Sequence, residues 1–527
     1  MKIRPLRRPW QSPQPLESAS RMATASRLRE APAALRGEGL TAKAHRVLPA
    51  LAVIVGVPAL LWVLYRPSYV NFDARYALLW ARDIVHGHTP DYTAAFAPTP
   101  HPLQTLVSFP VLLAGDSSAK AIVALTLLAL GCLTWLVYRL GAELWSPAAG
   151  VVAAVVVATR PSLDRFALIG YQDLAFAALV TYALLLETRK PKRGAPVLIV
   201  LTIAGLMRPD AWLLSLLYVA YLWRDIDPNE RTKLIALALS APVLWVAQDW
   251  IITGQPLHSL HGTKTLAGEV NRRRPPLSIP KRTLWYYKLL LLWPLAVGVP
   301  LRLAFAWLYA RKRFAVVVAT ALALTVWIVV TSVVGLSLIP RYLVTPSALL
   351  SIVFGLTVFG WTKLRPDQNR QIWKAAGILA LALSVAYIPS QVSKLRSIKH
   401  TMNNEARNYA DLRLVGQSPA VRARFRQCGT ISTIGHKAMP DLRYWLGGKP
   451  NSIDLVEGSK TKVGPLMLEP RATKQMWGFD RTHFASVKPP PGYAPLYENH
   501  SWAVYAAPGC SGGRLAAPPG GDVQAEG

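Results

Sequence analysis

The densest group of side chains able to transfer protons or bind a metal ion follows the first long apolar run. The stretch NFDARYALLWARDIVHGHTPDY, residues 71–92, contains three aspartates and two histidines among aromatic residues: Asp73, Asp83, His86, His88 and Asp91. Carboxylates and imidazoles act as general acids and bases and as metal ligands. These histidines and His101 are not spaced like a helical zinc site, so the use of a divalent metal ion stays open.

Asp73 begins DARYALLWARDIV, in which apolar and aromatic residues recur at helical spacing. The pattern predicts a short helix lying at the membrane surface. Two interpretations of Asp73 stay open at this point. It is a helix cap, because Asp is a favoured capping residue and suits the helix dipole, or a catalytic carboxylate, and the two roles are compatible. The other acidic and histidine residues of the stretch are expected to be surface or loop residues.

Further ionisable residues stand at the ends of later apolar runs, where buried charge is costly and usually faces a partner or a water-filled cavity. The segments RPSLDRFALIGYQDLAF, GLMRPDAW and LIPRYLVTP supply Asp164, Arg165, Tyr171, Asp173, Arg208, Asp210, Arg341 and Tyr342. Asp173 is also a candidate helix cap. Arg208 and Asp210 are candidates for a structural pair, and Arg341 for an anchor that reaches the membrane surface.

The composition places these residues in a polytopic membrane protein. Of 527 residues, 52% are hydrophobic and only 17% are charged, which is too apolar for an ordinary soluble protein of this length. The net charge of +31 does not indicate nucleic acid as a partner, because the basic residues gather at the ends of apolar runs. There they fix topology and contact anionic membrane lipid.

Apolar runs close to the roughly 20 residues that cross a bilayer recur through the first three quarters of the chain. About eleven transmembrane helices are predicted, near residues 47–65, 118–141, 147–159, 173–187, 195–208, 210–224, 234–252, 289–310, 314–335, 342–361 and 373–390. The basic stretches RKPKR, RDIDPNERTK, RKR and KLRPDQNR then share one side, which the positive-inside rule makes cytoplasmic. The prediction is a multi-pass protein of the cell membrane with a cytoplasmic N-terminus and an extracytoplasmic C-terminal domain.

The ends of the chain differ from its apolar middle. Residues 1–46 are predicted to be a disordered basic cytoplasmic arm, followed by a retained anchor rather than a cleaved signal peptide. Residues 391–512 contain short alternating segments such as TISTIG and SWAVYAA, which predict a small mixed α/β domain, and residues 513–527 a disordered tail. If this region lies outside the cytoplasm, Cys428 and Cys510 are able to form a disulfide.

One loop departs from the positive-inside rule. Residues 255–288 lie outside in this topology yet carry seven Lys and Arg residues, among them Arg272, Arg273 and Arg274. Either the topology is wrong there or the charge has a function. We favour a function, because inverting the loop would place the basic RKR at 311–313 on the wrong side. Arg and Lys pair with phosphate oxygens, so the loop suits capture of a lipid phosphate.

Seven short motifs follow the first apolar run in a fixed order: FDARYALLWARDI, TPHPL, AGDSSAKA, VYRLGAELWSPAAG, YQDLAFAALV, RPDAW and PRYLVTP. In this order the chain resembles the GT-C superfamily of integral membrane glycosyltransferases over residues 47–390, most strongly over 71–210. Residues 71–187 are similar to lipid-A aminoarabinose and protein mannosyl transferases. TPHPLQTL and RPDAW look closer to actinobacterial arabinofuranosyl and mannosyl transferases of the cell envelope.

The resemblance implies a fold and a reaction. The fold is an α-helical polytopic membrane domain with interfacial helices in the first external loop. The reaction moves a pentose or hexose from a polyprenyl-phosphate donor to an extracytoplasmic glycan, lipid or protein acceptor, with Asp73 as base and Asp173 in a supporting catalytic role. Substrate contacts are then expected from Arg75, Tyr76, His101, Arg165, Tyr171, Arg208, Asp210, Arg272, Arg273, Arg274, Arg341 and Tyr342.

The chain departs from the family pattern in two ways. Aminoarabinose transferases have a Lys before a Pro-Pro-Leu motif, and here Pro100 takes the Lys position and His101 that of the first Pro. The phosphate ligand is therefore expected from residues 272–274 or Arg341. Many relatives have two acidic residues at the start of the loop, whereas this chain has Asp73 alone, which leaves metal dependence open.

One carboxylate suffices for an inverting transfer, because it only takes the acceptor proton as the new bond forms. The phosphate leaves as an anion and needs cations rather than a general acid, whereas glycoside hydrolysis would need two facing carboxylates. Two other classes stay open. One is a transporter or flippase of a lipid-linked envelope precursor, with Arg208 and Asp210 lining a path, although the sequence shows no repeated halves. The other is a noncatalytic assembly protein.

Overall fold

The computed structural model describes residues 38–291, 299–456, 463–471 and 488–510. The chain divides into two compact units, residues 1–52 and residues 53–527. The described part of the first unit is the beginning of helix α2 (Glu38–Tyr65). This helix therefore begins inside the stretch 1–46 that the sequence predicts to be a disordered arm, and the rest of that stretch lies outside the described residues. Apart from the first residues of α2, all further description concerns residues 53–527.

Apolar helices make up most of the described chain. Six helical stretches in the described ranges are long and apolar enough to cross a membrane, and a seventh if the bent pair α7 and α8 makes one crossing. The six are Val47–Tyr65, Gly115–Leu144, Pro228–Thr253, Phe314–Val333, Pro340–Lys363 and Arg370–Gln417. The chain is therefore a multi-pass membrane protein, while the number of about eleven crossings stays a prediction.

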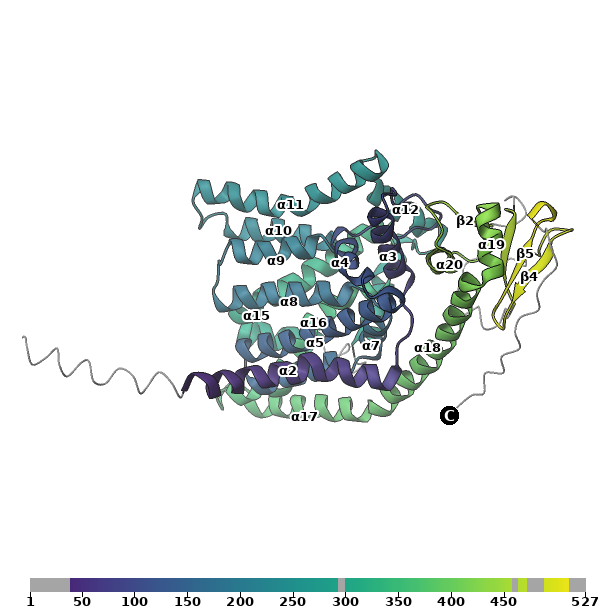
Figure 1. Ribbon diagram of the computed structural model, residues 1–527. Helices are drawn as coiled ribbons and strands as arrows, with labels where there is room; N and C mark the ends of the chain where they lie inside the picture. Colours follow the sequence, from purple (N-terminus) through teal and green to yellow (C-terminus); the bar gives the residue numbers. More distant parts are fainter. Residues whose placement is uncertain (1–37, 292–298, 457–462, 472–487, 511–527) are drawn as a thin grey trace, which may run out of the picture. The chain divides into compact units, whose positions relative to one another are not determined.

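The helices that follow α2 in the membrane part are α3 (Phe72–Val85), α4 (Pro102–Leu112), α5 (Ser118–Leu144), α6 (Pro147–Ala158), α7 (Pro161–Leu168), α8 (Asp173–Arg189), α9 (Ala195–Gly205), α10 (Asp210–Leu222), α11 (Pro228–Thr253), α12 (His258–Glu269), α13 (Ile279–Leu290), α15 (Val299–Val333), α16 (Val344–Phe359) and α17 (Arg370–Ala386), with 3-10 turns at Gly115–Ser117, Pro276–Ser278, Pro340–Leu343 and Gly360–Lys363. Helices α8 to α11 run side by side, and α3, α4, α7 and α12 gather toward one end of them (Figure 1). Helices α3 and α4 are the predicted interfacial helices of the first loop.

Local signals in the sequence set several helix ends. The Ser146 side chain accepts a hydrogen bond from the Ala149 amide at 3.3 Å, and Pro147 follows it as the first residue of α6. Ser at the cap and Pro at the first helical position are both favoured starts. Gly254 ends α11 in the left-handed conformation, with φ of 71°, which glycine adopts without steric cost.

The predicted break between spans 289–310 and 314–335 is wrong. Helix α15 is continuous from Val299 to Val333 and runs through the basic RKR at 311–313. Arg and Lys are good helix formers, so a basic triplet without Gly or Pro does not interrupt a helix. Residues 292–298 lie outside the described residues, and α13 ends before them at Leu290.

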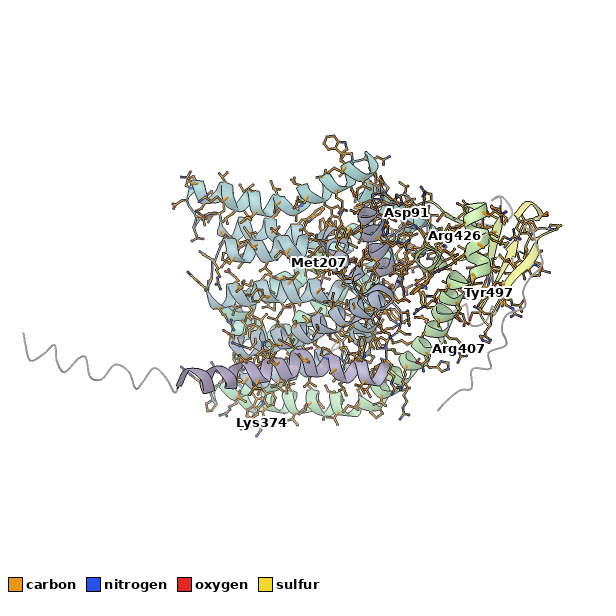
Figure 2. The ribbon with its side chains drawn as sticks, viewed as in Figure 1. Asp91, Met207, Lys374, Arg407, Arg426 and Tyr497 are labelled. Carbon is orange, nitrogen blue, oxygen red and sulfur yellow. The ribbon has the colours of Figure 1, made fainter. Side chains whose placement is uncertain are left out.

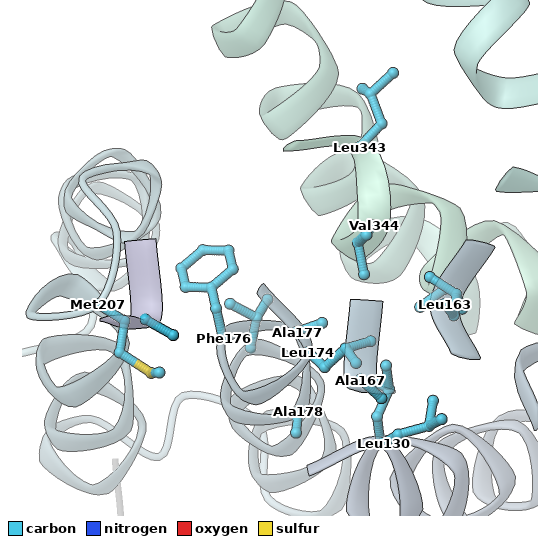
Figure 3. Packing of buried hydrophobic residues seen from close by; sticks show 14 of the residues in the cluster. Leu130, Leu163, Ala167, Leu174, Phe176, Ala177, Ala178, Met207, Leu343 and Val344 are labelled. Atoms are coloured by element: carbon cyan, nitrogen blue, oxygen red, sulfur yellow. The ribbon is translucent and has the colours of Figure 1, made fainter. Parts of the chain in front are cut away.

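The helices of the membrane part pack through small residues. Leu130 of α5, Ala167 of α7, Leu174 of α8 and Val344 of α16 belong to one buried apolar cluster (Figure 3). Elsewhere two backbones approach so closely that only glycine fits: a Cβ added at Gly355 of α16 would lie 2.1 Å from the Ala149 carbonyl oxygen of α6. Such close approach is typical of helix packing inside membranes.

The C-terminal region extends the last membrane helix into a small mixed domain. Helix α18 (Ile388–Gln417) begins directly after α17, so the predicted domain boundary at 390/391 falls inside its first turns. Figure 2 labels Lys374 on α17 beside the helix bundle and Arg407 farther along on α18. Helices α19 (Pro419–Cys428) and α20 (Ala438–Leu446) follow, and the 3-10 turn Pro508–Cys510 ends the described chain.

The sheet of this domain has five strands: β1 (Ile431–Thr433), β2 (Ile453–Leu455), β3 (Leu466–Pro470), β4 (Ala494–Glu498) and β5 (Trp502–Ala506). Their order is β2-β1-β3-β5-β4. Strand β1 is parallel to β2 and β3, and β5 is antiparallel to β3 and β4, with Ile431 opposite Ile453 and Leu468 opposite Val504. The predicted strands at TISTIG and SWAVYAA and the mixed domain are confirmed.

The cysteines agree in part with the sequence-based expectation. Cys428 is disulfide-bonded, and Cys132 in α5 has a free thiol. The side chain of Cys510 and the predicted tail, 513–527, lie outside the described residues. The pairing of Cys428 with Cys510 stays a prediction.

The contact between α6 and α16 gives a test of the fold. Replacing Gly355 by Ala should destabilise the protein by about 1–3 kcal/mol, because the new methyl group meets backbone rather than a movable side chain. Thermal unfolding of the purified protein in detergent measures the effect. The matched control is Gly56→Ala, since a Cβ there meets nothing within 4 Å. Equal melting temperatures for the two variants would contradict this packing.

Candidate active site

Asp73 lies in the first turn of α3 but does not cap it. Asn71 holds the cap position, because its side-chain oxygen accepts a hydrogen bond from the Ala74 amide at 3.1 Å. The Asn71 side chain also donates to the Ile169 carbonyl at 2.7 Å, which ties the start of α3 to the turn before α8. The capping interpretation of Asp73 is therefore wrong, and its carboxylate points to a different partner.

That partner is Arg341, in the 3-10 turn before α16. Arg341 Nη1 lies 2.5 Å from Asp73 Oδ2 and 4.0 Å from Asp173 Oδ2, so one guanidinium faces two carboxylates. Its Cζ stands 4.6 Å from the centroid of the Tyr171 ring. The side chains of Asp73 and Arg341 keep 20% and 18% exposure, so a ligand is able to reach them. Arg341 Nε has no hydrogen-bond partner in the described part of the chain.

Arg208 extends this pair into a chain of alternating charges. It forms ion pairs with Asp173 and, through Nε at 2.7 Å, with Asp210 Oδ2. The Tyr342 ring lies against its guanidinium, with the centroid 4.3 Å from Cζ. Asp173 is the first residue of α8 and binds arginine side chains. Arg208 and Asp210 therefore form the structural pair that the sequence allowed, and this pair is part of a larger network.

The network joins residues that are far apart in the sequence. Asp73 follows the first span, Asp173 begins α8, Arg208 and Asp210 lie between α9 and α10, and Arg341 precedes α16: these five residues form one alternating series, which we call the charged centre. It stands at the ends of several apolar helices. Unpaired charges there would be costly, so mutual neutralisation explains the arrangement.

The charges around Asp73 lower the pKa of its carboxyl group. Burial alone would raise the pKa of its carboxyl group, but the pair and hydrogen bond with Arg341 overcome this and hold the pKa below the ordinary value of 3.8. Arg272, exposed in the loop after α12, is near enough to lower it further. Asp73 is therefore ionised at neutral pH.

His101 contributes a neutral ring to the same region. Burial lowers the pKa of its imidazole to about 3, and the cationic Arg208 and Arg341 act in the same direction. The ring packs edge-on against Trp245 with centroids 5.5 Å apart. Its Nδ1 is buried and has no hydrogen-bond partner among the described residues. A neutral imidazole with an unused nitrogen is able to bind a hydroxyl or a phosphate oxygen.

Two predicted substrate contacts on α3 lie elsewhere. Arg75 is buried and pairs with Asp441 of α20 through Nε at 2.8 Å. With about 100° of rotation per residue, it stands on the opposite side of α3 from Asp73. Tyr76 is buried among aromatic rings, 4.9 Å from Phe72 between centroids. Both were expected at the substrate, but neither belongs to the charged centre, because a residue close to Asp73 along the chain need not share its helix face.

Of three other predicted arginines, two make contacts outside the charged centre. Arg165 pairs with Glu405 of α18 at 3.3 Å. Arg273 donates to the Lys264 carbonyl at 2.7 Å and closes its own loop. Arg274 is half-buried, and its Nε has no hydrogen-bond partner among described residues. Of the basic triplet, Arg272 is the member that acts on Asp73 electrostatically.

The other acidic and histidine residues of the stretch 71–92 agree only in part with the prediction that they are surface or loop residues. His86 and His88 are exposed, as expected. Asp83 and Asp91, expected at the surface or in a loop, are buried and both bind Arg443 of α20, at 2.6 and 2.7 Å. Nothing local in the sequence indicates this, because the arginine lies hundreds of residues away.

Asp249 is a further residue that the sequence analysis missed. It accepts hydrogen bonds from the Ser259 amide at 2.7 Å and the Ser259 hydroxyl at 2.6 Å, and so fixes the start of α12. An aspartate inside the apolar run of α11 was an available signal. In the described ranges, no group of three or more His, Cys, Asp or Glu side chains is arranged to hold a metal ion.

Sequence comparison identifies no relative: no protein-family model and no curated protein matches the chain. Structure comparison finds proteins of similar fold. The crystal structure of ArnT from Cupriavidus metallidurans bound to undecaprenyl phosphate matches with a TM-score of 0.52 and 14% identity, covering 89% of this chain and 100% of that chain. The apo state of the same protein gives 0.50 and 12% identity over the same shares. An Archaeoglobus fulgidus oligosaccharyltransferase gives 0.45 and 14%, covering 78% of this chain and 65% of its own, which is too weak for argument.

At this level of identity the comparison shows the fold alone. That fold is the one implied by the order of the motifs in the sequence. The chain shares its fold with ArnT.

Proposed function

We propose that this chain is a membrane glycosyltransferase. It moves a pentose or hexose from a polyprenyl-phosphate donor to a hydroxyl of an extracytoplasmic glycan, lipid or protein, with inversion at the anomeric carbon. The observation that carries the proposal is the charged centre, in which Asp73 is ionised, partly exposed and paired with Arg341 at 2.5 Å. The fold adds support, because ArnT, whose structure matches this chain, binds undecaprenyl phosphate.

Asp73 is the proposed base. As the acceptor oxygen forms its bond to the anomeric carbon, the bond from that carbon to the phosphate oxygen breaks, and the acceptor proton passes to the Asp73 carboxylate. One group in hydrogen-bond reach is enough for this step. The proton then leaves with solvent or with the released polyprenyl phosphate, so no further reactant is needed.

The cations are proposed to bind the donor phosphate. Arg272 is exposed near Asp73, and Arg341 has an unused Nε as well as its contacts to carboxylates. Negative charge grows on the phosphate as it leaves, and preorganised cations stabilise it more in the transition state than in the ground state. When the phosphate draws on Arg341, the arginine holds Asp73 less tightly, so the carboxylate becomes a stronger base as the donor binds.

Asp173, Arg208 and Asp210 are proposed to orient this pair. Asp173 binds both Arg208 and, at 4.0 Å, Arg341. Arg208 is anchored in turn by Asp210 at 2.7 Å. Charged groups held by their own partners lose less freedom when substrate binds, which is how supporting residues sustain catalytic geometry.

An apolar cavity beside the charged centre suits a lipid chain. It has a volume of about 440 Å³ and lies between α4, α5 and the start of α8. Gln172 and Met207, the chain neighbours of Asp173 and Arg208, line it together with Leu136 of α5. The cavity therefore begins next to charged residues and continues among side chains of membrane helices, as a lipid phosphate with a long hydrocarbon tail requires.

The topology completes the proposal. The basic loops on the side of the helices opposite the charged centre make that side cytoplasmic by the positive-inside rule. The charged centre and the C-terminal domain then face outward in the cell membrane, with the N-terminus in the cytoplasm. Flipping of a lipid-linked precursor is the competing function, and it predicts movement of the donor across a membrane without a new glycosidic bond.

The role of Asp73 is tested by Asp73→Asn. Removing the base should lower kcat for transfer from a polyprenyl-phosphate sugar by about 10²–10⁴-fold while the protein still inserts and binds donor. Product formation is followed by mass spectrometry of the acceptor in detergent or nanodiscs. Asp116→Asn is the control, because Asp116 is an exposed residue near the first loop. Full activity of Asp73→Asn would remove it as the base.

The role of the basic loop is tested one residue at a time. Arg272→Gln should raise the donor KM by about 10- to 100-fold, the equivalent of one charge-assisted hydrogen bond of about 1.5–3 kcal/mol. Lys281→Gln removes the same charge from an exposed position at the start of α13 and should leave KM unchanged. Equal effects of the two substitutions would mean that the loop acts only through its overall charge.

The pH profile tests the pairing of Asp73 with Arg341. The profile of kcat/KM reports the free enzyme, in which Arg341 holds the pKa of Asp73 below 3.8, so activity should persist to low pH. Without Arg341 the burial of Asp73 loses its largest opposing interactions, and the pKa of Asp73 rises. The acid limb should therefore move to higher pH in Arg341→Met and stay low in Arg341→Lys. An acid limb at the same pH in both variants would exclude the pairing as its cause.

A further inference from the structure

Helix α3 is bound on two opposite sides. Asp73 faces Arg341 on one side. Arg75 and Arg82 follow at about 200° and about 180° around the helix from Asp73, because each residue adds about 100°. These two arginines bind α20 of the C-terminal domain. The same short helix therefore carries the proposed base and the attachment of a domain formed by the last quarter of the chain.

The attachment consists of buried, reciprocal ion pairs. Arg75 of α3 binds Asp441 of α20, and their side chains are 3% and 2% exposed. In the reverse sense, Arg443 of α20 binds Asp83 of α3 and Asp91 of the following loop, all at most 4% exposed. Asp91 is labelled in Figure 2. Each helix thus supplies both signs of charge to the other, and this fixes their register as well as their contact.

Further contacts reinforce the ion pairs. Arg82 donates to the carbonyls of Tyr444 and Gly448, at 2.9 and 3.3 Å. The Arg75 guanidinium lies 4.5 Å from the Tyr444 ring centroid. At the start of α3, the ring of His436 packs edge-on against Phe72, the residue before Asp73, with centroids 5.3 Å apart. The C-terminal domain therefore touches α3 from its first residue almost to its last turn.

We propose that Arg75 and Asp441 are positioning residues, through which the C-terminal domain holds α3 in the orientation that keeps Asp73 against Arg341. This inference rests on the proposed function. It makes the C-terminal domain a required part of the catalytic unit rather than a separate module for binding glycan. Neither residue touches substrate. Their effect reaches the reaction through the rotation and position of α3, and a displacement of about 1 Å at a reacting group is able to cost about 100-fold in rate.

The two partners should not respond equally to substitution. Burial raises the pKa of Asp441 to about 6, so without Arg75 its carboxyl group takes up a proton and becomes neutral. Arg75 has no such escape, because a guanidinium stays charged in proteins. Asp441→Asn therefore leaves an unpaired buried cation, whereas Arg75→Met leaves a neutral acid. We expect the larger defect from Asp441→Asn, and recovery in the double variant Arg75→Met with Asp441→Leu, which removes both charges.

The experiment measures docking and transfer separately on the full-length protein. Hydrogen exchange reports whether α3 (Phe72–Val85) is held, and steady-state kinetics report kcat and donor KM. For Asp441→Asn we expect faster exchange in α3, a fall in kcat of about 100-fold and a donor KM within about 2-fold of the wild type. The double variant should restore both slow exchange and kcat. Glu498→Gln, which removes an exposed ion pair with Arg471 in the same domain, should change neither.

The outcomes separate this inference from the proposed function. Faster exchange in α3 with unchanged kcat, or unchanged exchange in Asp441→Asn, overturns the positioning role. A fall in kcat that the double variant does not recover despite restored slow exchange also overturns it, because the charges would then act in the reaction itself. If the wild type transfers no sugar, the proposed function fails, and the exchange data still decide whether the ion pairs hold α3.

Discussion

Asp73 and Asp173 are two carboxylates at the same end of a membrane helix bundle, and Arg341 lies 2.5 and 4.0 Å from them. Without a cation between them the two like charges would repel each other. Arg208 neutralises the far side of Asp173 and is itself anchored by Asp210. The charged centre then holds three carboxylates and two arginines, and Arg272 supplies the third positive charge. The phosphate of the proposed donor would add negative charge, which the exposed Arg272 would help to balance.

The rest of the molecule supports the pair of Asp73 and Arg341. The apolar helices bring together the ends of segments that are distant in sequence, and close packing at glycines such as Gly355 keeps those ends in place. Helix α3 has only 14 residues, so its stability comes mainly from tertiary packing rather than from its own helix propensity. Its other side is fixed by buried ion pairs to α20, so the position of Asp73 depends on the bundle and on the C-terminal domain together.

The sequence predicted the parts of this arrangement that depend on local pattern. Apolar runs predicted the helices, and the alternation in SWAVYAA predicted β5. Charged residues at the ends of apolar runs indicated Asp73, Asp173, Arg208 and Arg341 as candidate site residues. It failed where the outcome depends on partners far along the chain. Arg75 was expected at the substrate but binds Asp441 of α20, and Asp83 was expected at the surface or in a loop but binds Arg443 of α20. A basic triplet was taken as a helix break, although Arg and Lys favour helices.

The most direct test of this account is a structure of the protein with a bound polyprenyl phosphate. The account predicts the phosphate within hydrogen-bond distance of Arg341 and Arg272, the lipid chain along the cavity between α4, α5 and α8, and a longer separation between Arg341 and Asp73 than the 2.5 Å seen here. A phosphate bound away from both arginines, with the pair of Asp73 and Arg341 unchanged, would contradict it.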